Sequence, residues 1–293
     1  MPATVRPRRS VLYMPGANAR ALEKARGLAC DAIIMDLEDA VAPDAKVRAR
    51  EQILVALAEG GYGEREVVVR ANALSTPWGR DDLAALAKAG ADAILLPKIE
   101  SADALRQALS LLDEAGAPET LAVWVMMEMP RAILEAQAIA SASPKLTALV
   151  MGTSDLAEDL HAAHTTMRLP LLTALSHCIL AARAYDLVIL DGVYLDLADD
   201  KGFAEVCRQG AELGFDGKTL IHPKTIAAAN AAFAPSETEV EWARRIIAAH
   251  AEAEAAGKGV VLVDGKLIEN LHVAAAHRTV ALTQRIEALE AAL

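Results

Sequence analysis

Several charged side chains stand at the ends of short apolar runs, where they could act together on one ligand. Glu128 ends the run AVWVMME, and Asp155 comes just after the run ALVMGTS. If both carboxylates face one site, they repel each other unless a cation lies between them. Their oxygens suit Mg²⁺ with several retained waters, and Mn²⁺ would fit as well. The alternative is that one carboxylate caps a helix and the other forms a surface ion pair.

Arg70 interrupts the valine run EVVVRAN. A buried guanidinium is costly unless it meets carboxylates or a ligand anion, so Arg70 is a candidate for gripping a substrate oxygen through paired hydrogen bonds. A structural ion pair with Asp36 or Glu38 is the alternative, and both roles can hold together. Asp36, Glu38 and Asp39 could also hold waters that are bound to the metal.

Two further residues at run ends are weaker candidates for a catalytic or binding role. Lys98, in AILLPKI, could form a Schiff base, but an acidic surrounding would keep its ammonium charged and therefore non-nucleophilic. His222, in IHP, has no second histidine at ligand spacing, which limits it to binding or positioning. The sequence contains no Gly-x-Ser-x-Gly elbow, no Gly-x-Gly-x-x-Gly and no P-loop, which argues against serine hydrolases and against dinucleotide and NTP enzymes.

Each of these residues stands at the end of an apolar run because the chain repeats one pattern, a continuous apolar run followed by a helix-like stretch. Continuous runs are typical of parallel strands buried on both faces, and eight of them separated by helices predict an α/β fold, a (β/α)₈ TIM barrel. The predicted strands are 9–15, 32–38, 66–72, 93–99, 122–128, 148–154, 187–193 and 217–223. Such barrels build their sites at the carboxyl ends of the strands. The residues expected at that rim are Asp36, Glu38, Asp39, Arg70, Asn72, Lys98, Glu128, Asp155 and His222.

Helical spacing of apolar positions predicts an outer ring of helices. The clearest are 18–28, 44–57, 79–89, 101–112 and 131–139. Turn signals precede three strands, as helix-to-strand connections require. They are Asp31, the GAD of residues 90–92 and the GFDG of residues 214–217.

We expect the barrel to occupy residues 1–235 and a C-terminal extension to occupy residues 236–293. Ser236 and Glu239 are spaced as a capping box before a helix over about 240–255, which GKG at 257–259 should end. Residues 260–268 carry Asp264 and Gly265 between two apolar segments and predict a hairpin, followed by a helix over about 273–291. Because this extension lacks a core of its own, we expect it to form a lid over this barrel or a neighbouring subunit's.

Composition favours one barrel in a soluble, cytoplasmic protein. Of 293 residues, 54% are hydrophobic but only 3% aromatic, so small aliphatic side chains must do the packing, as barrel interiors prefer. No apolar run reaches the roughly 18 to 20 residues of a membrane span. The net charge of −11 opposes nucleic-acid binding. Cys30, Cys178 and Cys207 lie in helix-like surroundings without CxxC spacing and are interpreted as structural thiols.

The N-terminal part is nevertheless locally basic. Its basic side chains could receive a phosphorylated group, and a solvated basic face is an equal alternative. They are Arg6, Arg8, Arg9, Arg20, Lys24 and Arg26.

Longer strings resemble the citrate lyase beta subunit-like family of the HpcH/HpaI aldolase superfamily. The first is RSVLYMPGANARALEKARGLACDAIIMDLEDAVAPDAKVRAR, residues 9–50. Further matches are VVVRANALSTPWGRDDL, ILLPKIES, MMEMPRAI, VMGTSDLAEDL, GFDGKTLIHPKTI and VVLVDGKLIENLHV, which cover nearly the whole chain in order. Within the family, LDGVY and VDGKLIENLH are most similar to malyl-CoA lyases and malyl-CoA thioesterases.

The resemblance implies a metal, a substrate class and an assembly. Glu128 and Asp155 match the family's Mg²⁺ ligands, and Arg70 matches the arginine that holds the substrate or its enolate. Known members are homo-oligomers, often trimers or hexamers, in which an acidic C-terminal residue can reach a neighbour's site, and Glu269 or Asp264 stands in that region. The positions where the family approaches coenzyme A are Tyr13, Pro15, Arg20, Lys24, Ile221, His222 and Pro223.

The implied activity is Mg²⁺-dependent cleavage, or the reverse condensation, of a carbon–carbon bond in a 3-hydroxyacyl-CoA such as (3S)-malyl-CoA or citramalyl-CoA. Arg70 would stabilise the thioester enolate, and Glu269 or Asp264 would transfer the proton. The alternatives are hydrolysis of malyl-CoA, a partner-dependent subunit of the citrate lyase beta type, and an aldolase that uses no coenzyme A. Two departures bear on the choice. Glu128 is followed by MPRAI, which adds Arg131 as a carboxylate-binding candidate, and Glu269 stands where Asp is common.

Overall fold

The computed structural model describes residues 5–255, 257 and 261–292, and these form two compact units. The barrel unit is Arg8–Phe233. The second unit consists of the described residues among 5–7 and 234–292. The division that we propose from the sequence falls after residue 235.

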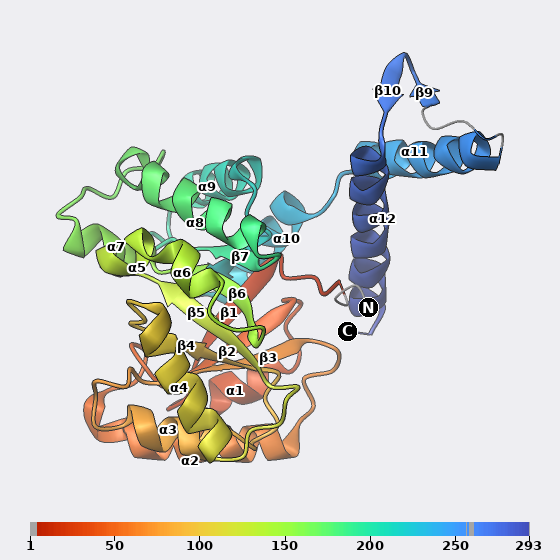
Figure 1. Ribbon diagram of the computed structural model, residues 1–293. Coiled ribbons are helices and arrows are strands. Elements are labelled where there is room, and N and C mark those ends of the chain that lie inside the picture. The colour runs from red at the N-terminus through yellow and green to blue at the C-terminus, as the bar shows by residue number, and fades with distance from the viewer. Residues whose placement is uncertain (1–4, 256, 258–260, 293) are drawn as a thin grey trace. The chain divides into compact units, whose positions relative to one another are not determined.

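The barrel unit contains a closed sheet of eight parallel strands, which confirms the predicted (β/α)₈ TIM barrel (Figure 1). The strands are β1 Ser10–Pro15, β2 Ala32–Asp36, β3 Glu66–Arg70, β4 Ala93–Leu96, β5 Ala122–Met127, β6 Leu146–Met151, β7 Val188–Asp191 and β8 Gly217–Leu220. Each strand pairs with the next along the chain, and β8 pairs back with β1, where Lys218 lies beside Ser10. All lie within the predicted runs, except that β6 begins two residues earlier.

Alternate residues of each strand pack into the barrel interior, and the others pack against the surrounding helices. Val11, Ile34, Val68, Leu95 and Trp124 belong to the interior cluster, which is fully buried at these positions. Because both faces of a parallel strand are covered, apolar residues are needed at every position. This is why the runs in the sequence are continuous rather than alternating.

A ring of helices covers the sheet. The helices are α1 Ala19–Ala25, α2 Lys46–Glu59, α3 Gly79–Leu86, α4 Ala102–Glu114, α5 Pro130–Leu134, α6 Ala136–Ala140, α7 Thr153–Asp159, α8 Leu172–Ala184, α9 Asp200–Leu213 and α10 Ile226–Phe233, with 3₁₀ turns η1 Pro43–Ala45, η2 Leu169–Leu171 and η3 Pro223–Thr225. The prediction of one helix over 131–139 was wrong. Glu135 leaves helical geometry (φ −96°, ψ 10°) and separates α5 from α6.

The predicted turn residues before strands are confirmed by what their carboxylates bind. Asp31 accepts a hydrogen bond from the Arg9 backbone N–H, and Asp216 accepts one from Ile189 N–H, each at 2.8 Å. Asp92 accepts one from Val67 N–H at 2.9 Å. Each aspartate thereby ties the start of its own strand to the start of a neighbouring strand.

The second unit contains α11 Glu237–Ala255, β9 Val261–Val263, β10 Lys266–Ile268 and α12 Asn270–Ala291. The predicted capping box is confirmed, since Ser236 N–H donates to Glu239 Oε2 and Glu239 N–H donates to Ser236 Oγ. The hairpin is also confirmed, with Asp264 and Gly265 at φ 49° and 76°, as a two-residue turn requires. The predicted helix break at 258–259 and strand residue Val260 lie outside the described residues, and the lid remains a prediction.

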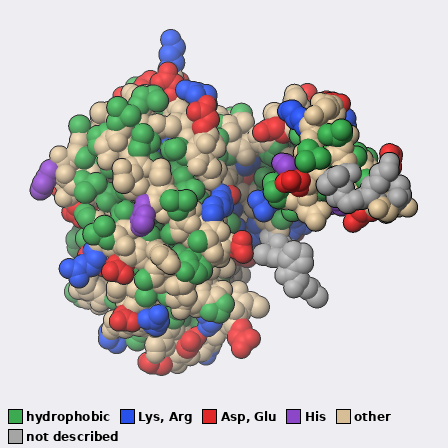
Figure 2. Space-filling model, turned by 45° about the horizontal axis from the view of Figure 1, so that its top comes forward, with side chains coloured by type: hydrophobic (Ala, Val, Ile, Leu, Met, Phe, Trp, Pro, Cys, Tyr) green, Lys and Arg blue, Asp and Glu red, His purple; other side chains and the backbone are tan. Residues whose placement is uncertain are grey.

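The three cysteines are buried free thiols, as a structural role requires. Cys178 and Cys207 lie in α8 and α9, whereas Cys30 lies in the connection before β2 rather than in helix-like surroundings. Acidic and basic side chains are interspersed on the face of the barrel unit drawn in Figure 2. Within the described part of the chain, none of the helices combines the length and apolarity that a bilayer crossing needs.

Candidate active site

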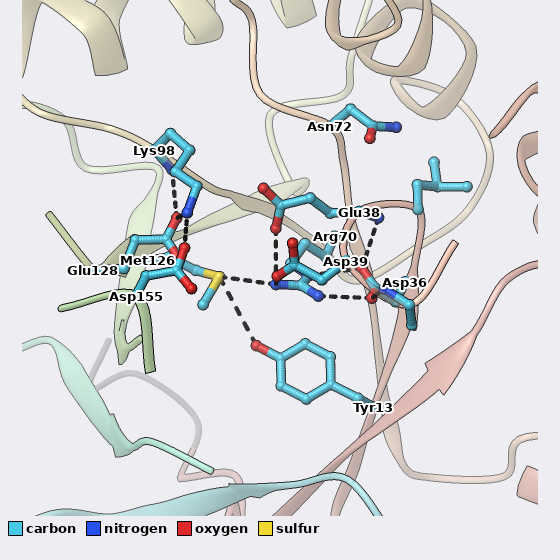
Figure 3. A network of polar contacts seen from close by, with 12 residues as sticks. Tyr13, Asp36, Glu38, Asp39, Arg70, Asn72, Lys98, Met126, Glu128 and Asp155 are labelled. Carbon is cyan, nitrogen blue, oxygen red and sulfur yellow. Dashed lines mark hydrogen bonds and ion pairs between the residues drawn. The ribbon is translucent and has the colours of Figure 1, made fainter. Parts of the chain in front are cut away.

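Arg70 ends β3 and lies buried among three carboxylates (Figure 3). Its Nε and Nη2 donate to the two oxygens of Asp36 at 2.6 and 2.7 Å. Its Nη1 lies 2.8 Å from Glu38 Oε2 and 3.1 Å from Asp39 Oδ2. Burial would lower the pKa of Arg70, but the attraction of Asp36, Tyr13 and Glu38 and the hydrogen bonds to Asp36 together outweigh burial and raise that pKa, so the guanidinium stays charged. The anticipated ion pair with Asp36 is therefore present, and Glu38 contacts the same guanidinium.

Strand register explains why Asp36 meets Arg70, because the two residues are paired across β2 and β3. Asp36 is fully buried and also accepts hydrogen bonds from the backbone N–H groups of Glu38 and Ala40 at 2.9 and 3.0 Å. Its oxygens are thus occupied within the protein. We therefore assign Asp36 to orienting Arg70, while Glu38 and Asp39 remain candidates for holding metal-bound water.

Lys46, the first residue of α2, binds the backbone of the loop that carries Glu38 and Asp39. Its Nζ donates to the backbone carbonyls of Leu37 at 2.8 Å and Glu38 at 2.7 Å. It also lies 5.6 Å from the centre of the Trp78 ring. Sequence reasoning missed this residue. The available signal was a lysine in the first turn of a helix, where the macrodipole disfavours a cation and another reason for it is needed.

Burial shifts the pKa of two groups that lie beside Arg70. Burial raises the pKa of Glu38 to about 8, although Arg70 opposes the shift. Burial also raises the pKa of Tyr13 well above its usual value, so the phenol is neutral. The Tyr13 ring centre lies 4.8 Å from the guanidinium. The Tyr13 hydroxyl donates a weak hydrogen bond to Met126 Sδ at 3.9 Å.

Glu128 and Asp155 converge on one cation, the ammonium of Lys98 (Figure 3). Glu128 directly follows β5, and Asp155 lies in the first turn of α7 after β6, so the pairing of these strands brings the two carboxylates together. Lys98 N–H donates to Glu128 Oε1 at 2.7 Å, and Lys98 Nζ lies 3.6 Å from that oxygen and contacts Asp155 Oδ2. Burial raises the pKa of Glu128, and Lys98 opposes this.

This donor set fits a hard divalent ion. Five carboxyl groups, those of Asp36, Glu38, Asp39, Glu128 and Asp155, face the cations Arg70, Lys98 and Lys46 in these contacts. Among the described residues, no three His, Cys, Asp or Glu side chains gather as a ready-made metal cage. Mg²⁺ commonly takes one or two carboxylates and completes its shell with water and substrate oxygens. Glu128 and Asp155 would be its protein ligands.

A second network, which sequence reasoning did not find, fixes Asn72 just after β3. Asp82, buried in the first turn of α3, accepts hydrogen bonds from Asn72 N–H at 3.0 Å, from Asn72 Nδ2 at 2.6 Å and from Arg50 Nη1 at 2.9 Å. With its amide nitrogen held by Asp82, Asn72 keeps one side-chain orientation at the rim (Figure 3).

The positions expected near coenzyme A divide into two groups. Tyr13 and Pro15 lie at the end of β1, and Ile221 to Pro223 follow β8, so all belong to the carboxyl rim. His222 accepts a hydrogen bond from Lys224 N–H through Nδ1 and thereby caps η3, which fits a positioning role. Arg20 and Lys24 on α1 and Arg131 on α5 are exposed.

The basic N-terminal segment is not one patch. Arg8 binds both oxygens of Glu66 at 2.5 and 2.8 Å, and Arg9 binds Asp31 at 2.8 and 2.9 Å. Glu66 begins β3 and Asp31 precedes β2, so these ion pairs lie at the amino ends of the strands, opposite the rim with Glu128. These two ion pairs join the amino ends of neighbouring strands, and Arg26 forms ion pairs with Glu23 and Glu59. Arg6 belongs to the second unit, so Arg20 and Lys24 are the basic residues of the barrel unit that stay candidates for binding a phosphorylated group.

Glu269 and Asp264 belong to the second unit. Asp264 occupies the hairpin turn and forms an ion pair with Arg245 at 2.6 Å. Glu269 precedes α12, and its backbone N–H donates to His272 Nδ1 at 3.0 Å. The assignment of either as the proton-transfer group remains a prediction.

Residues 9–223 match the HpcH/HpaI aldolase/citrate lyase family. The chain belongs to this family. A (3S)-malyl-CoA thioesterase from Cereibacter sphaeroides is 50% identical over 285 residues, which cover 97% of this chain and 98% of that protein. The citrate lyase subunit beta of Escherichia coli is 35% identical over 269 residues, which cover 90% and 89% of the two chains. Both relatives carry the names of enzymes, and this member of the family is an enzyme as well.

Solved structures of the family share the fold. The structure of protein CitE from Mycobacterium tuberculosis in complex with magnesium, acetoacetate and coenzyme A superposes with a TM-score of 0.71 at 29% identity. The match covers 96% of this chain and 98% of that one. Magnesium and coenzyme A are thus bound by a protein with this architecture.

Proposed function

We propose that the protein is a Mg²⁺-dependent enzyme acting on the coenzyme A thioester of a short 3-hydroxy dicarboxylic acid of the malyl-CoA kind. One observation carries the proposal, namely that Glu128 and Asp155 share a single cation beside the buried guanidinium of Arg70. A metal next to a fixed positive group suits a substrate with both a carboxylate and a carbonyl oxygen. The related thioesterases and the magnesium and coenzyme A complex of CitE support this choice.

Two net reactions compete. The sequence resemblance puts carbon–carbon cleavage first, with glyoxylate and acetyl-CoA as products. The thioesterases are 50% identical and the citrate lyase beta subunit 35% identical, and this difference moves hydrolysis to malate and free coenzyme A to first place. Carbon–carbon cleavage is the second candidate, which the aldolase and lyase character of the family supports.

Arg70 can serve either reaction. Both place negative charge on the thioester oxygen, as an enolate in cleavage or as a tetrahedral oxyanion in hydrolysis. Asp36 fixes the plane of the guanidinium, and Nη1 faces Asp39, an exposed side chain that a substrate anion can replace. The neutral Tyr13 hydroxyl can donate a further hydrogen bond. Bound Mg²⁺ would supply polarisation of the substrate's carboxylate and hydroxyl oxygens.

Either reaction also needs a group that moves a proton. We keep Glu269 and Asp264, from this or a neighbouring subunit, as the proposed proton-transfer residues. Within the barrel unit, Glu38 is an additional candidate, because burial raises its pKa to about 8 and a group that titrates near neutral pH can both accept and return a proton.

The deciding experiment follows two products at once. Purified protein is incubated with (3S)-malyl-CoA and Mg²⁺, with and without a chelator, while glyoxylate and free thiol are measured. Free thiol without glyoxylate supports hydrolysis, and glyoxylate without thiol supports carbon–carbon cleavage. Product formation that survives the chelator contradicts the metal site. If neither product forms, malyl-CoA is the wrong substrate, and citramalyl-CoA or dependence on partner chains, as in the citrate lyase beta type, comes next.

A matched pair of variants ties the activity to the site. Glu128→Gln removes one proposed metal ligand and should abolish turnover. Glu158→Gln removes a carboxylate from the exposed face of α7, the helix that carries Asp155, and should leave turnover unchanged.

A further inference from the structure

Lys98 has an unusual backbone that aims its N–H at Glu128. The residue follows β4 with φ 53°, a left-handed conformation that side-chain-bearing residues adopt rarely and at a cost. In this conformation its N–H donates to Glu128 Oε1 at 2.7 Å. A strained residue of this kind persists where the surrounding structure requires it, and here the requirement is contact with a nearly fully buried carboxylate.

The side chain of Lys98 turns to the same carboxylates. Its ammonium contacts Asp155 Oδ2 and lies 3.6 Å from Glu128 Oε1 (Figure 3). Lys98 therefore approaches Glu128 through both its backbone and its side chain. Two neighbouring carboxylates without a cation would repel each other, so the ammonium stabilises the pair in the absence of metal.

The ammonium and a divalent ion would compete for the same oxygens. A carboxylate oxygen that already contacts the ammonium is less available to a metal, and a metal bound by the same carboxylates would repel the ammonium. The Lys98 side chain is 31% exposed, whereas that of Glu128 is 1% exposed. The flexible side chain of Lys98 can therefore move its ammonium into water, while the carboxylate of Glu128 stays buried at the site.

We propose that Lys98 is a built-in counterion that holds Glu128 and Asp155 together when no metal is bound, and that Mg²⁺ binding displaces its ammonium into solvent. The inference rests on the proposed function, because it takes these two carboxylates as the metal ligands. It gives Lys98 a role other than that of a nucleophile. The ammonium offsets the repulsion between the two carboxylates in the metal-free protein and, by competing for their oxygens, lowers the affinity for Mg²⁺.

The first test measures Mg²⁺ affinity by isothermal titration calorimetry, without substrate or turnover. Lys98→Met keeps the length and apolar stem but removes the competing charge, so it should bind Mg²⁺ roughly two- to fivefold more tightly than the wild type. Lys145→Met is the matched control, because Lys145 pairs with the exposed Asp113 away from the rim. The Mg²⁺ affinity of this variant should equal that of the wild type. A structural role alone would make Lys98→Met bind more weakly.

The second test uses the unaltered protein and does not depend on the folding of a variant. Lysines are acetylated briefly with acetic anhydride, with and without saturating Mg²⁺, and quantified by mass spectrometry. Lys98 should react at least twofold faster with Mg²⁺, because its amino group leaves the two carboxylates that hold its proton and can meet the reagent as a neutral amine, while Lys145 should react equally in both.

The outcomes separate the two proposals. Affinity of Lys98→Met equal to or weaker than wild type, or acetylation of Lys98 that is unchanged or slowed by Mg²⁺, overturns the counterion role. If the wild type shows no Mg²⁺ binding in the calorimeter, the metal site of the proposed function itself is wrong.

Discussion

At the scale of single residues, Arg70 shows how position decides what an ion pair contributes. Asp36 and Asp39 both contact this guanidinium, but the Asp36 side chain is 0% exposed and that of Asp39 is 65% exposed. An exposed pair exchanges readily with water, whereas loss of a buried partner leaves a charge without compensation. The two carboxylates should therefore differ sharply in their effect on stability.

Asp36→Asn should lower the free energy of unfolding by roughly 3 to 5 kcal/mol, because Arg70 would remain buried with its bidentate partner neutralised. Asp39→Asn should change it by less than about 0.5 kcal/mol. Urea unfolding of the metal-free proteins, followed by circular dichroism, measures both. Equal effects of the two substitutions would contradict the geometry.

The raised pKa of Glu38 should make the free energy of unfolding depend on pH. Burial raises this pKa from 4.5 to about 8, so the folded state binds the proton more tightly than the unfolded state. The resulting stability is present in full below pH 4.5, declines as the pH rises toward 8 and is lost above it. Glu38→Gln has no carboxyl group at this position, so its stability does not decline for this reason as the pH rises. The unfolding free energy of the variant minus that of the wild type should therefore increase from pH 5 to pH 9, and a flat difference would show that Glu38 is an ordinary carboxyl group.

At the scale of elements, the site depends on how closely the connection from β6 to α7 packs on the end of β5. Gly152 lies in that connection, and a Cβ added there would stand 2.3 Å from Glu128 Cβ and 2.9 Å from Glu128 Oε2. A glycine is needed because any side chain would push the carboxylate out of place. Gly27, after α1, has open space around it, with its closest neighbour at 4.0 Å.

Gly152→Ala should weaken Mg²⁺ binding by tenfold or more (about 1.4 kcal/mol), because Glu128 must move to admit the methyl group. The clash should also destabilise the fold by about 1 to 3 kcal/mol. Gly27→Ala should change neither quantity appreciably. Calorimetry with Mg²⁺ and thermal unfolding test both statements, and wild-type affinity in Gly152→Ala would show that Glu128 is not a ligand.

At the scale of the whole molecule, the helix ring presents large apolar side chains to solvent. Leu134 on α5 is 82% exposed and Leu180 on α8 is 70% exposed. These two helices pack against each other. If copies of the chain associate through this face, both side chains would become buried in the interface.

The family resemblance implies a homo-oligomer, so we expect the wild-type protein to elute as a trimer or hexamer in size-exclusion chromatography with light scattering. Leu134→Asp combined with Leu180→Asp should shift the mass toward the monomer, because burying two carboxylates in an apolar interface is costly. Val55→Asp is the control, because Val55 is an exposed residue of α2, and this variant should keep the wild-type mass. A monomeric wild type would remove the basis for a neighbour's residue in the active site.

The sequence by itself determined the barrel and the rim that carries the site. Apolar runs buried on both faces, aspartates before strands and the rule that strand ends carry the chemistry are enough to place Arg70, Glu128 and Asp155 at one rim. These are local patterns that repeat along the chain. They also located the hairpin and the capping box of the second unit, which depend on neighbouring residues alone.

Only the tertiary structure decided which side chains bind one another. Lys98 reaches Glu128 and Asp155 across 30 and 57 positions of sequence, from a left-handed backbone that no pattern in the sequence indicates. Lys46 binds carbonyl groups rather than a charged partner, and Asp82 binds Asn72 from another element. The physical reason is that a strand's position follows from its own hydrophobicity, whereas a side chain's partner follows from loop conformation and from which charges share a buried volume.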